Sequence, residues 1–266
     1  MSAKMTVKKL RNMKQAGDKI VMLTAYDASF AQILDQQLVD VILVGDSLGM
    51  VIQGCESTVP VTMDDMVYHT KIVSPVCNYS LVLSDLPFMS YTSTVDAIKN
   101  ASRLMQEGGA HMVKLEGGES QIENVTQLSR HGVPVCAHLG LQPQSVHKLG
   151  GYFVQGRDQK MADKMLEDAL LLQDAGADMV LLECVPVDLA DKITKALEVP
   201  TIGIGAGRVC DGQVLVLQDM LGISKNAPSF SQDFLMGQSE GIAGAVSAYI
   251  KEVKYQTFPS DAQCFV

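Results

Sequence analysis

The chain of 266 residues lacks several features that would place it in a specialised class of protein. It has no apolar run of about 18 residues, so no transmembrane helix is expected. It carries 21 basic against 30 acidic residues, a net charge of −9, and so lacks the positive surface that attracts nucleic acids or an anionic membrane. Its 22 glycines and 9 prolines are far from the content of collagen-like or low-complexity chains. We therefore expect a globular protein without a nucleic-acid or membrane partner.

The six cysteines include no Cys-x-x-Cys pair that would suggest a redox or zinc motif. A basic N-terminal segment containing Lys8, Lys9 and Arg11 is followed by the short apolar run Ile20–Leu23 and then by Asp27. That run is too short for the apolar region of a secretion signal. We therefore expect reduced thiols and a cytoplasmic location.

The composition favours one well-packed domain spanning residues 1–266. Hydrophobic residues make up 47% of the chain and charged residues 19%, which excludes a disordered protein. A chain of this length can bury a large core without disulfides or a structural metal. No shift in composition and no linker divides it.

Short apolar runs alternate with longer helical patterns along the chain. The runs predict strands at Ile20–Tyr26, Val41–Asp46, Leu81–Leu86, His111–Glu116, Val133–His138, Asp178–Cys184 and Thr201–Ile204. Helix signals between them include N-terminal capping boxes at Thr62 and Ser93, and an additional helix, capped by Thr6, precedes the first strand. This order predicts an α/β fold, a (β/α)₈ TIM barrel with an extra N-terminal helix.

Two points of this fold prediction are less well marked. The eighth strand would have to lie between Leu221 and Phe234, where the pattern is weak. An open, doubly wound sheet is the alternative, but its glycine fingerprint would follow the first strand. The sequence there is Thr24-Ala25-Tyr26-Asp27, without glycine.

In five consecutive predicted strands, one mostly apolar face ends in an ionisable residue. Because strand side chains alternate between two faces, each of these residues shares a face with apolar residues before it. The sets are Ile42, Val44 and Asp46; Leu81, Leu83 and Asp85; Met112, Lys114 and Glu116; Pro134, Cys136 and His138; and Met179, Leu181 and Glu183. The carboxyl ends of barrel strands carry catalytic groups, so this pattern predicts a site there. The alternative is that each is an isolated loop or helix-capping residue.

Four carboxylates converging on one site would repel one another, and a divalent cation would relieve the repulsion. Oxygen ligands without a Cys or His cluster favour Mg²⁺ over Zn²⁺. Lys114, one layer deeper than Glu116, is either a structural ion-pair partner or a cation placed for a substrate carboxylate or oxyanion.

Two further segments have more than one interpretation. Ser47 lies between glycines in Val44-Gly45-Asp46-Ser47-Leu48-Gly49, but no neighbouring base supports a serine nucleophile. Gly203-Ile204-Gly205-Ala206-Gly207 has the wrong spacing for a dinucleotide fingerprint. It is either a phosphate-binding turn or a tight turn that permits close packing.

Several motifs together resemble the ketopantoate hydroxymethyltransferase family, in order from about Lys8 to Pro259. They are Val44-Gly45-Asp46-Ser47-Leu48-Gly49-Met50, Ser84-Asp85-Leu86-Pro87-Phe88, Val113-Lys114-Leu115-Glu116-Gly117-Gly118, His138-Leu139-Gly140-Leu141-Gln142-Pro143-Gln144, Val154-Gln155-Gly156-Arg157, Leu182-Glu183-Cys184-Val185-Pro186 and Ile202-Gly203-Ile204-Gly205-Ala206-Gly207. The resemblance implies a barrel of the phosphoenolpyruvate/pyruvate type. It also implies a hydroxymethyltransferase that makes ketopantoate for pantothenate and coenzyme A synthesis.

The resemblance also implies ligands and roles. The substrates would be the 2-oxo acid 3-methyl-2-oxobutanoate and 5,10-methylenetetrahydrofolate, with Mg²⁺ as the metal and a homodecamer as the assembly. Metal ligands would be Asp46, Asp85 and Glu116; substrate contacts would be Asp46, Ser47, Asp85, Lys114 and His138; and Glu183 would be the catalytic base. In this chemistry a metal-stabilised enolate of the oxo acid attacks the methylene carbon.

The chain departs from the family pattern at two places. Gln142 stands where a small hydroxyl residue is usual, and Ser231-Gln232-Asp233-Phe234 replaces a more basic stretch. Two other functions are weighed against this one. The first is another Mg²⁺-dependent carbon–carbon lyase or transferase acting on 2-oxo acids, although no cysteine here lies in the Lys- and Gly-rich loop usual in such lyases. The second is a barrel retained only as a scaffold.

Overall fold

The computed structural model describes residues 3–266 as a closed barrel of eight parallel strands. The strands are β1 (Ile20–Thr24), β2 (Val41–Val44), β3 (Leu81–Asp85), β4 (Met112–Glu116), β5 (Val135–Gly140), β6 (Met179–Glu183), β7 (Thr201–Ile204) and β8 (Gly212–Leu215). They are arranged around the barrel in sequence order, and β8 closes it by pairing with β1, with Ile20 beside Gly212. The predicted TIM barrel is confirmed.

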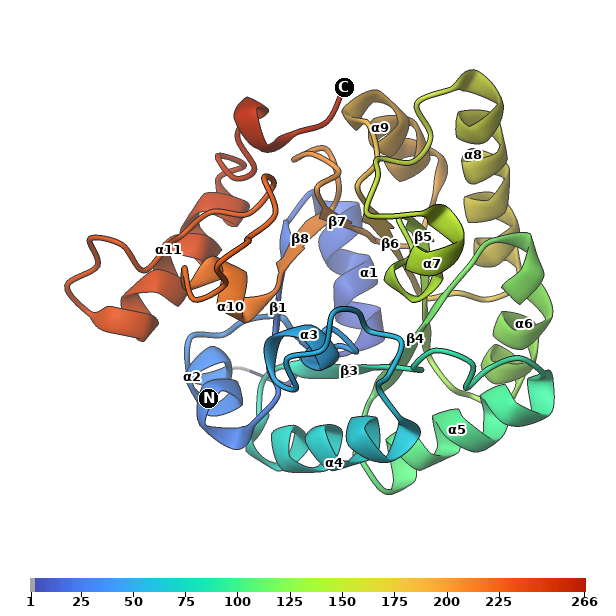
Figure 1. The fold of residues 1–266 in the computed structure, drawn as a ribbon, viewed down its shortest axis with the longest axis horizontal. Helices are drawn as coiled ribbons and strands as arrows, with labels where there is room; N and C mark the ends of the chain where they lie inside the picture. The colour runs from blue at the N-terminus through green and yellow to red at the C-terminus, as the bar shows by residue number, and fades with distance from the viewer. Residues whose placement is uncertain (1–2) are drawn as a thin grey trace.

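Helices surround the barrel (Figure 1). The α-helices are α1 (Val7–Ala16), α2 (Ala28–Gln36), α3 (Leu48–Val51), α4 (Met63–Val73), α5 (Thr94–Gln106), α6 (Ile122–Arg130), α7 (Val146–Leu149), α8 (Gln159–Asp174), α9 (Val187–Ala196), α10 (Leu217–Met220) and α11 (Gly241–Lys254). Short 3₁₀ turns are η1 (Ser74–Val76), η2 (Glu119–Gln121), η3 (Pro143–Ser145) and η4 (Asp261–Gln263). Of the helices within residues 3–266, none combines the length and the apolar character needed to cross a bilayer.

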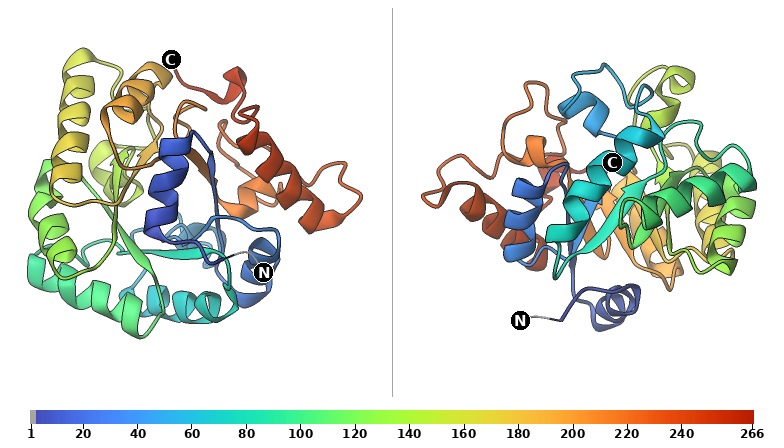
Figure 2. Two further views of the ribbon diagram at one scale, coloured as in Figure 1. Left: turned by 180° about the vertical axis from the view of Figure 1, so that it is seen from behind. Right: turned by 90° about the horizontal axis from the view of Figure 1, so that it is seen from below.

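The predicted extra helix is α1, and it closes the amino-terminal end of the barrel (Figure 2). The Thr6 side chain accepts a hydrogen bond from the Lys9 N–H, and Gly17 ends the helix with φ 77°. Leu10 is buried among the side chains that fill the barrel interior, such as Met22 and Leu81. Burial of this residue anchors α1 against the open end of the barrel.

The position of the eighth strand is a correction. It is Gly212–Leu215, whereas residues 221–234 form turns and irregular chain. Residues 205–211 connect β7 to β8 without a helix, and α10 and α11 both follow β8. A strand of four residues that includes Gly212 and Gln213 has too weak an apolar pattern to be recognised, and no helix separates it from β7 in the described chain.

Candidate active site

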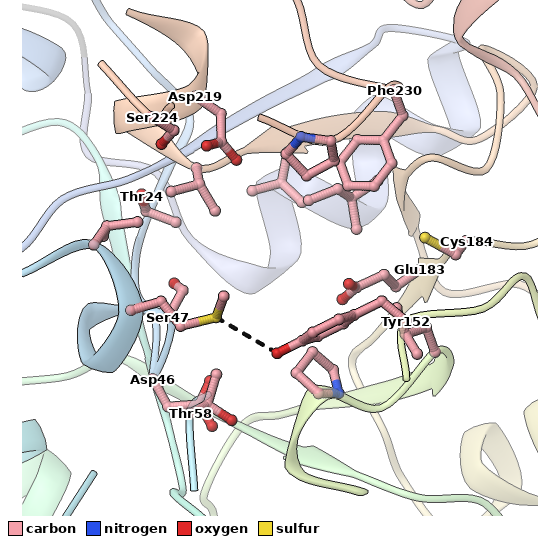
Figure 3. A pocket seen from close by; sticks show the side chains of 18 of the residues that line it. Thr24, Asp46, Ser47, Thr58, Tyr152, Glu183, Cys184, Asp219, Ser224 and Phe230 are labelled. Carbon is pink, nitrogen blue, oxygen red and sulfur yellow. Dashed lines mark hydrogen bonds between the residues drawn. The ribbon is translucent and has the colours of Figure 1, made fainter. Parts of the chain in front are cut away.

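All seven predicted site residues line a single cavity of about 890 Å³ at the carboxyl ends of the strands. They are Asp46, Ser47, Asp85, Lys114, Glu116, His138 and Glu183. Figure 3 shows Asp46, Ser47 and Glu183 around it, and Tyr152 reaches over the cavity so that its hydroxyl lies 3.7 Å from the sulfur of Met50. The sequence pattern therefore predicted the location of this cavity.

Strand alternation places four of the five strand-end residues, but not Asp46. The barrel interior contains Val41 and Leu43 of β2, whereas Ile42 and Val44 pack outside against the helices, so the predicted face of β2 is wrong. The ladder ends at Val44, and Asp46 reaches the cavity from the turn that follows. Its backbone N–H donates to Oδ2 of Asp85 at 3.0 Å, which ties this turn to β3.

Lys114 and Asp85 form a buried ion pair on neighbouring strands. The Lys114 Nζ lies 3.2 Å from Asp85 Oδ1, and the two side chains are 4% and 3% exposed. Burial acts to lower the pKa of Lys114, but the carboxylates of Asp85, Glu116 and Asp46 outweigh it and raise the pKa above its usual value. Lys114 is therefore a permanent cation, and it also lines the cavity. Its position is compatible with both predicted roles, as an ion-pair partner and as a cation for a substrate carboxylate or oxyanion.

His138 lies between two carboxylates. Its Nδ1 is 3.5 Å from Glu116 Oε1, and its Nε2 is 3.3 Å from Glu183 Oε2. Burial and the Lys114 ammonium, 3.3 Å from Nδ1, act to lower the pKa of His138, but Glu116 and Glu183 prevail and raise it to about 9. The imidazole therefore holds a proton at neutral pH and orients Glu183 at the cavity.

The buried acids have unused capacity to bind a cation. Burial, together with Asp85 and Glu116, raises the pKa of Asp46, and burial also raises the pKa of Asp85. Oδ1 of Asp85 and Oε1 of Glu116 are buried without a hydrogen-bond partner, apart from the ionic contacts with Lys114 and His138. A buried acceptor atom without a partner lowers the stability of the fold unless a ligand binds it.

The carboxylates of Asp46, Asp85 and Glu116 suit a Mg²⁺ ion that is also coordinated by water and substrate. They suit a metal ion coordinated only by protein side chains less well. In the part of the chain that the structure describes, no three His, Cys, Asp or Glu side chains are already arranged to hold a metal ion. Magnesium commonly binds through one or two carboxylates, with waters and substrate oxygens completing its coordination. The donor chemistry and the unpartnered oxygens therefore suit Mg²⁺ bound together with a substrate.

Gln144, in η3, hydrogen-bonds to two of the acids, and no sequence pattern singled out its side chain. Its Nε2 donates to Asp46 Oδ2 at 2.8 Å, and its backbone N–H donates to Glu116 Oε2 at 3.1 Å. The Tyr91 hydroxyl donates to Gln144 Oε1 at 2.6 Å and fixes the amide orientation. A neutral residue in a short turn has no periodicity, so only its place in the His138–Gln144 motif could have drawn attention to it.

The glycine-rich segment after β7 serves packing. Gly205 has φ +61°, and a Cβ there would lie 2.8 Å from the Phe230 ring and 3.1 Å from that of Phe265. A side chain would displace both rings, which supports the close-packing interpretation of the segment over a phosphate-binding one.

The two departures from the family pattern lie outside the described lining of the cavity. Gln142 lines a separate pocket, together with Lys160. Phe234, in the second departure, is buried against the rings of Tyr249 and Phe258, each centred 5.4 Å away. Neither departure changes the acidic group.

Comparisons with known proteins give matches over nearly the whole chain. Residues 4–261 match the family model described as ketopantoate hydroxymethyltransferase. A relative from Nitrosococcus oceani named 3-methyl-2-oxobutanoate hydroxymethyltransferase is 60% identical over 96% of this chain and 97% of its own. A relative of the same name from Alkalilimnicola ehrlichii is 57% identical over 98% of this chain and 94% of its own.

Solved structures of other proteins share the fold at low sequence identity. Phosphonopyruvate hydrolase in complex with oxalate and Mg²⁺ matches with a TM-score of 0.61 and 10% identity, covering 80% of each chain. 2,3-Dimethylmalate lyase, a member of the PEP mutase/isocitrate lyase superfamily, matches with a TM-score of 0.55 and 16% identity, covering 74% of this chain and 70% of its own. These likenesses show that the fold, a closed (β/α)₈ barrel, is shared with those proteins.

Proposed function

This chain belongs to the ketopantoate hydroxymethyltransferase family, and we propose that it transfers a hydroxymethyl group from 5,10-methylenetetrahydrofolate to 3-methyl-2-oxobutanoate. The product is ketopantoate, a precursor of pantothenate and coenzyme A. The observation that carries the proposal is the convergence of acids, Lys114 and His138 from five successive strands and their following turns on one cavity. The same convergence argues against a barrel retained only as a scaffold, because buried charges without a ligand cost stability.

The oxo acid binds at the acidic end of the cavity in this proposal. Asp46, Asp85 and Glu116 would hold Mg²⁺, which supplies Lewis-acid stabilisation of the negative charge that develops on the keto oxygen. The Lys114 ammonium faces the same space and stabilises that charge from the β4 side. The Ser47 hydroxyl, 2.7 Å from the Tyr26 hydroxyl, contacts the substrate from the turn after β2.

Glu183 removes the proton from C3 of the oxo acid in the proposed mechanism. Its side chain lines the cavity, and His138 orients it through the 3.3 Å contact with Oε2. The C3 proton passes to Glu183, and the electron pair of the C–H bond moves into the enolate. The enolate carbon then forms the new bond to the methylene carbon, and the hydroxyl group of a water molecule adds to the same carbon as its two bonds to folate nitrogens break. The C3 proton and the second proton of the water end on those two nitrogens, so tetrahydrofolate is the leaving group.

Exchange of the C3 proton in deuterated water tests the base directly. The Glu183→Gln variant should bind Mg²⁺ and 3-methyl-2-oxobutanoate normally but should lose exchange by about 10²–10⁴-fold. The Gln142→Ala variant, altered outside the cavity, is the control and should exchange at the wild-type rate. Wild-type exchange in Glu183→Gln would remove Glu183 as the base.

Metal binding tests the acid assignments separately. In a Mg²⁺ titration, Asp85→Asn should bind the ion more weakly, because it removes one of the charges that attract the cation. Unchanged Mg²⁺ affinity would remove Asp85 from the ligand set. Product formation that needs no folate would instead favour the alternative 2-oxo acid lyase or transferase.

The assembly and location belong to the same proposal. We expect a homodecamer in the cytoplasm, as the family resemblance implies. All six cysteines lie in the described residues, and none of them is disulfide-bonded there. Sedimentation analysis of the purified protein would measure the assembly, and a dimer or monomer would contradict the expectation.

A further inference from the structure

The cavity has a second end whose chemistry differs from that of the acidic group. There the lining comes from β8 and the chain after it, and it includes Val216, Gln218, Asp219, Ser224 and Phe230. Figure 3 shows Asp219 and Ser224 beside one another, apart from Asp46. A small branched oxo acid at the acidic end leaves this second end for another ligand.

Asp219 is a buried carboxylate without a cation partner among residues 3–266. The residue is 8% exposed and forms no ion pair with a described Lys, Arg or His, although Lys225 also lines the cavity. Burial raises its pKa, and the Ser224 hydroxyl only partly opposes this effect. A carboxylate held in this way has acceptor capacity to offer a ligand.

A second acceptor lies next to it. Gln218 is 9% exposed, and its Oε1 is buried without any hydrogen-bond partner in the described chain. Both residues are in α10, and both line the cavity. An unpartnered acceptor in a native protein calls for an explanation, and a ligand with N–H donors supplies one.

The surfaces beside these acceptors are apolar. Ile204, Val216 and the ring of Phe230 line the same end of the cavity, and the Phe265 ring packs against Phe230 with centres 6.4 Å apart. Such walls suit a flat ring that is buried on its faces and hydrogen-bonded at its edge.

We propose that Asp219 binds the donor edge of the pterin ring of the folate cosubstrate. The N3–H and the 2-amino group of the pterin both donate to the Asp219 carboxylate, Gln218 Oε1 offers a further acceptor, and Phe230 covers a ring face. This inference rests on the proposed function, because it assigns the part of the site that holds the one-carbon donor. In this arrangement the folate cosubstrate lies across the cavity from the acids that activate the oxo acid.

Binding of tetrahydrofolate and of its 2-desamino analogue, measured by calorimetry with Mg²⁺ present, tests the inference. The wild type should bind tetrahydrofolate about 10- to 100-fold more tightly than the analogue, since the analogue lacks one donor to a charged acceptor. Asp219→Asn should bind tetrahydrofolate about 10- to 100-fold more weakly than the wild type and should no longer discriminate between the two ligands. The comparison with the analogue on the wild type needs no variant to fold.

Asp233→Asn is the matched control. Asp233 is an exposed acid in the segment that follows Phe230, and it is not among the described residues that line the cavity. It should bind both ligands as the wild type does. Equal binding of the two ligands by the wild type, or undiminished tetrahydrofolate binding by Asp219→Asn, would overturn the inference.

The affinity for 3-methyl-2-oxobutanoate separates this inference from the proposed function. Asp219→Asn should keep that affinity, and a loss of it would overturn the assignment of Asp219 to the folate. If the wild type binds the oxo acid but no tetrahydrofolate, the folate-dependent function fails and this inference fails with it. If discrimination is absent while tetrahydrofolate still binds, only the inference fails.

Discussion

The two ends of the barrel differ in how completely the protein itself hydrogen-bonds their buried carboxylates. At the amino end, Asp35 accepts hydrogen bonds from the backbone N–H groups of Asn78, Tyr79 and Ser80. Asp40, just before β2, accepts from the Val21 N–H, the Tyr79 hydroxyl and the Lys254 ammonium. These carboxylates are fully engaged by the protein itself, so their contribution is to hold the barrel together.

At the carboxyl end the acids are incompletely partnered. Asp85 Oδ1 and Glu116 Oε1 have ionic contacts with Lys114 and His138 but no hydrogen-bond partner in the described chain, and Gln218 Oε1 on the β8 side has no hydrogen-bond partner there either. Leaving buried acceptors unpartnered costs stability, so this end of the barrel retains capacity that only a ligand can use. The comparison teaches that hydrogen-bond satisfaction, rather than the number of acids, distinguishes the structural end of this barrel from the candidate catalytic end.

Removing Lys114, the buried cation at the carboxyl end of the barrel, should have the largest effect on the free energy of unfolding. Lys114→Met leaves Asp85 buried beside Asp46 without its ion-pair partner, so we expect a loss of about 3–5 kcal/mol in the free energy of unfolding at neutral pH. Lys14→Met is the control at the amino end, where Lys14 pairs with Asp211 in a less buried position. Urea unfolding measures both, and equal losses would erase the proposed difference between the ends.

The pH dependence of the free energy of unfolding should reveal the contribution of protonated His138. Its pKa is about 9 in the folded protein and about 6.5 in an unfolded chain, so the protonated form is favoured by folding. This contribution, about 3 kcal/mol, should be fully present below pH 6.5 and lost as the pH rises through 9. Urea unfolding of the wild type and of His138→Asn at both pH values measures it. A stability difference between the two proteins that stays constant across this range would contradict the prediction.

At the amino end, Asp35→Asn should affect stability alone. The amide keeps one acceptor but loses the charge and the bond from the Asn78 N–H, so we expect a loss of about 1.5–3 kcal/mol in unfolding free energy. Folate-dependent turnover, measured on folded protein, should equal that of the wild type. A selective fall in turnover would show that the two ends are coupled.

The smallest effect should come from an exposed ion pair of α1. Arg11 lies 2.7 Å from Asp178, but its side chain is 47% exposed. Solvent screens such pairs, so Arg11→Ala should cost no more than about 1 kcal/mol in thermal or urea unfolding. A larger loss would show that α1 depends on this pair more than on the burial of Leu10.

Much of the candidate site follows from period-two alternation within the strands. On β3, β4, β5 and β6 the predicted faces are the observed ones, so Asp85, Glu116, His138 and Glu183 could be placed from sequence. On β2 the same argument fails, because the ladder ends at Val44 and the turn decides where Asp46 points. Alternation has no meaning beyond the last paired residue.

Gln144 and Gln218 show a second limit. Each is a neutral residue in a short helical turn, and each gains its importance from atoms distant in the chain. Asp46 Oδ2, for example, is the partner of the Gln144 amide across 98 positions of sequence. A local pattern carries no record of such a contact.

By itself the sequence determined the class of the fold, the capped helix before the barrel and the acids at the ends of its strands, because these depend on local periodicity and helix capping. Only the tertiary structure decided where the barrel closes, which way Asp46 turns and which buried oxygens remain without partners. Those outcomes depend on how distant segments share space and hydrogen bonds, and that is settled only when the whole chain is packed.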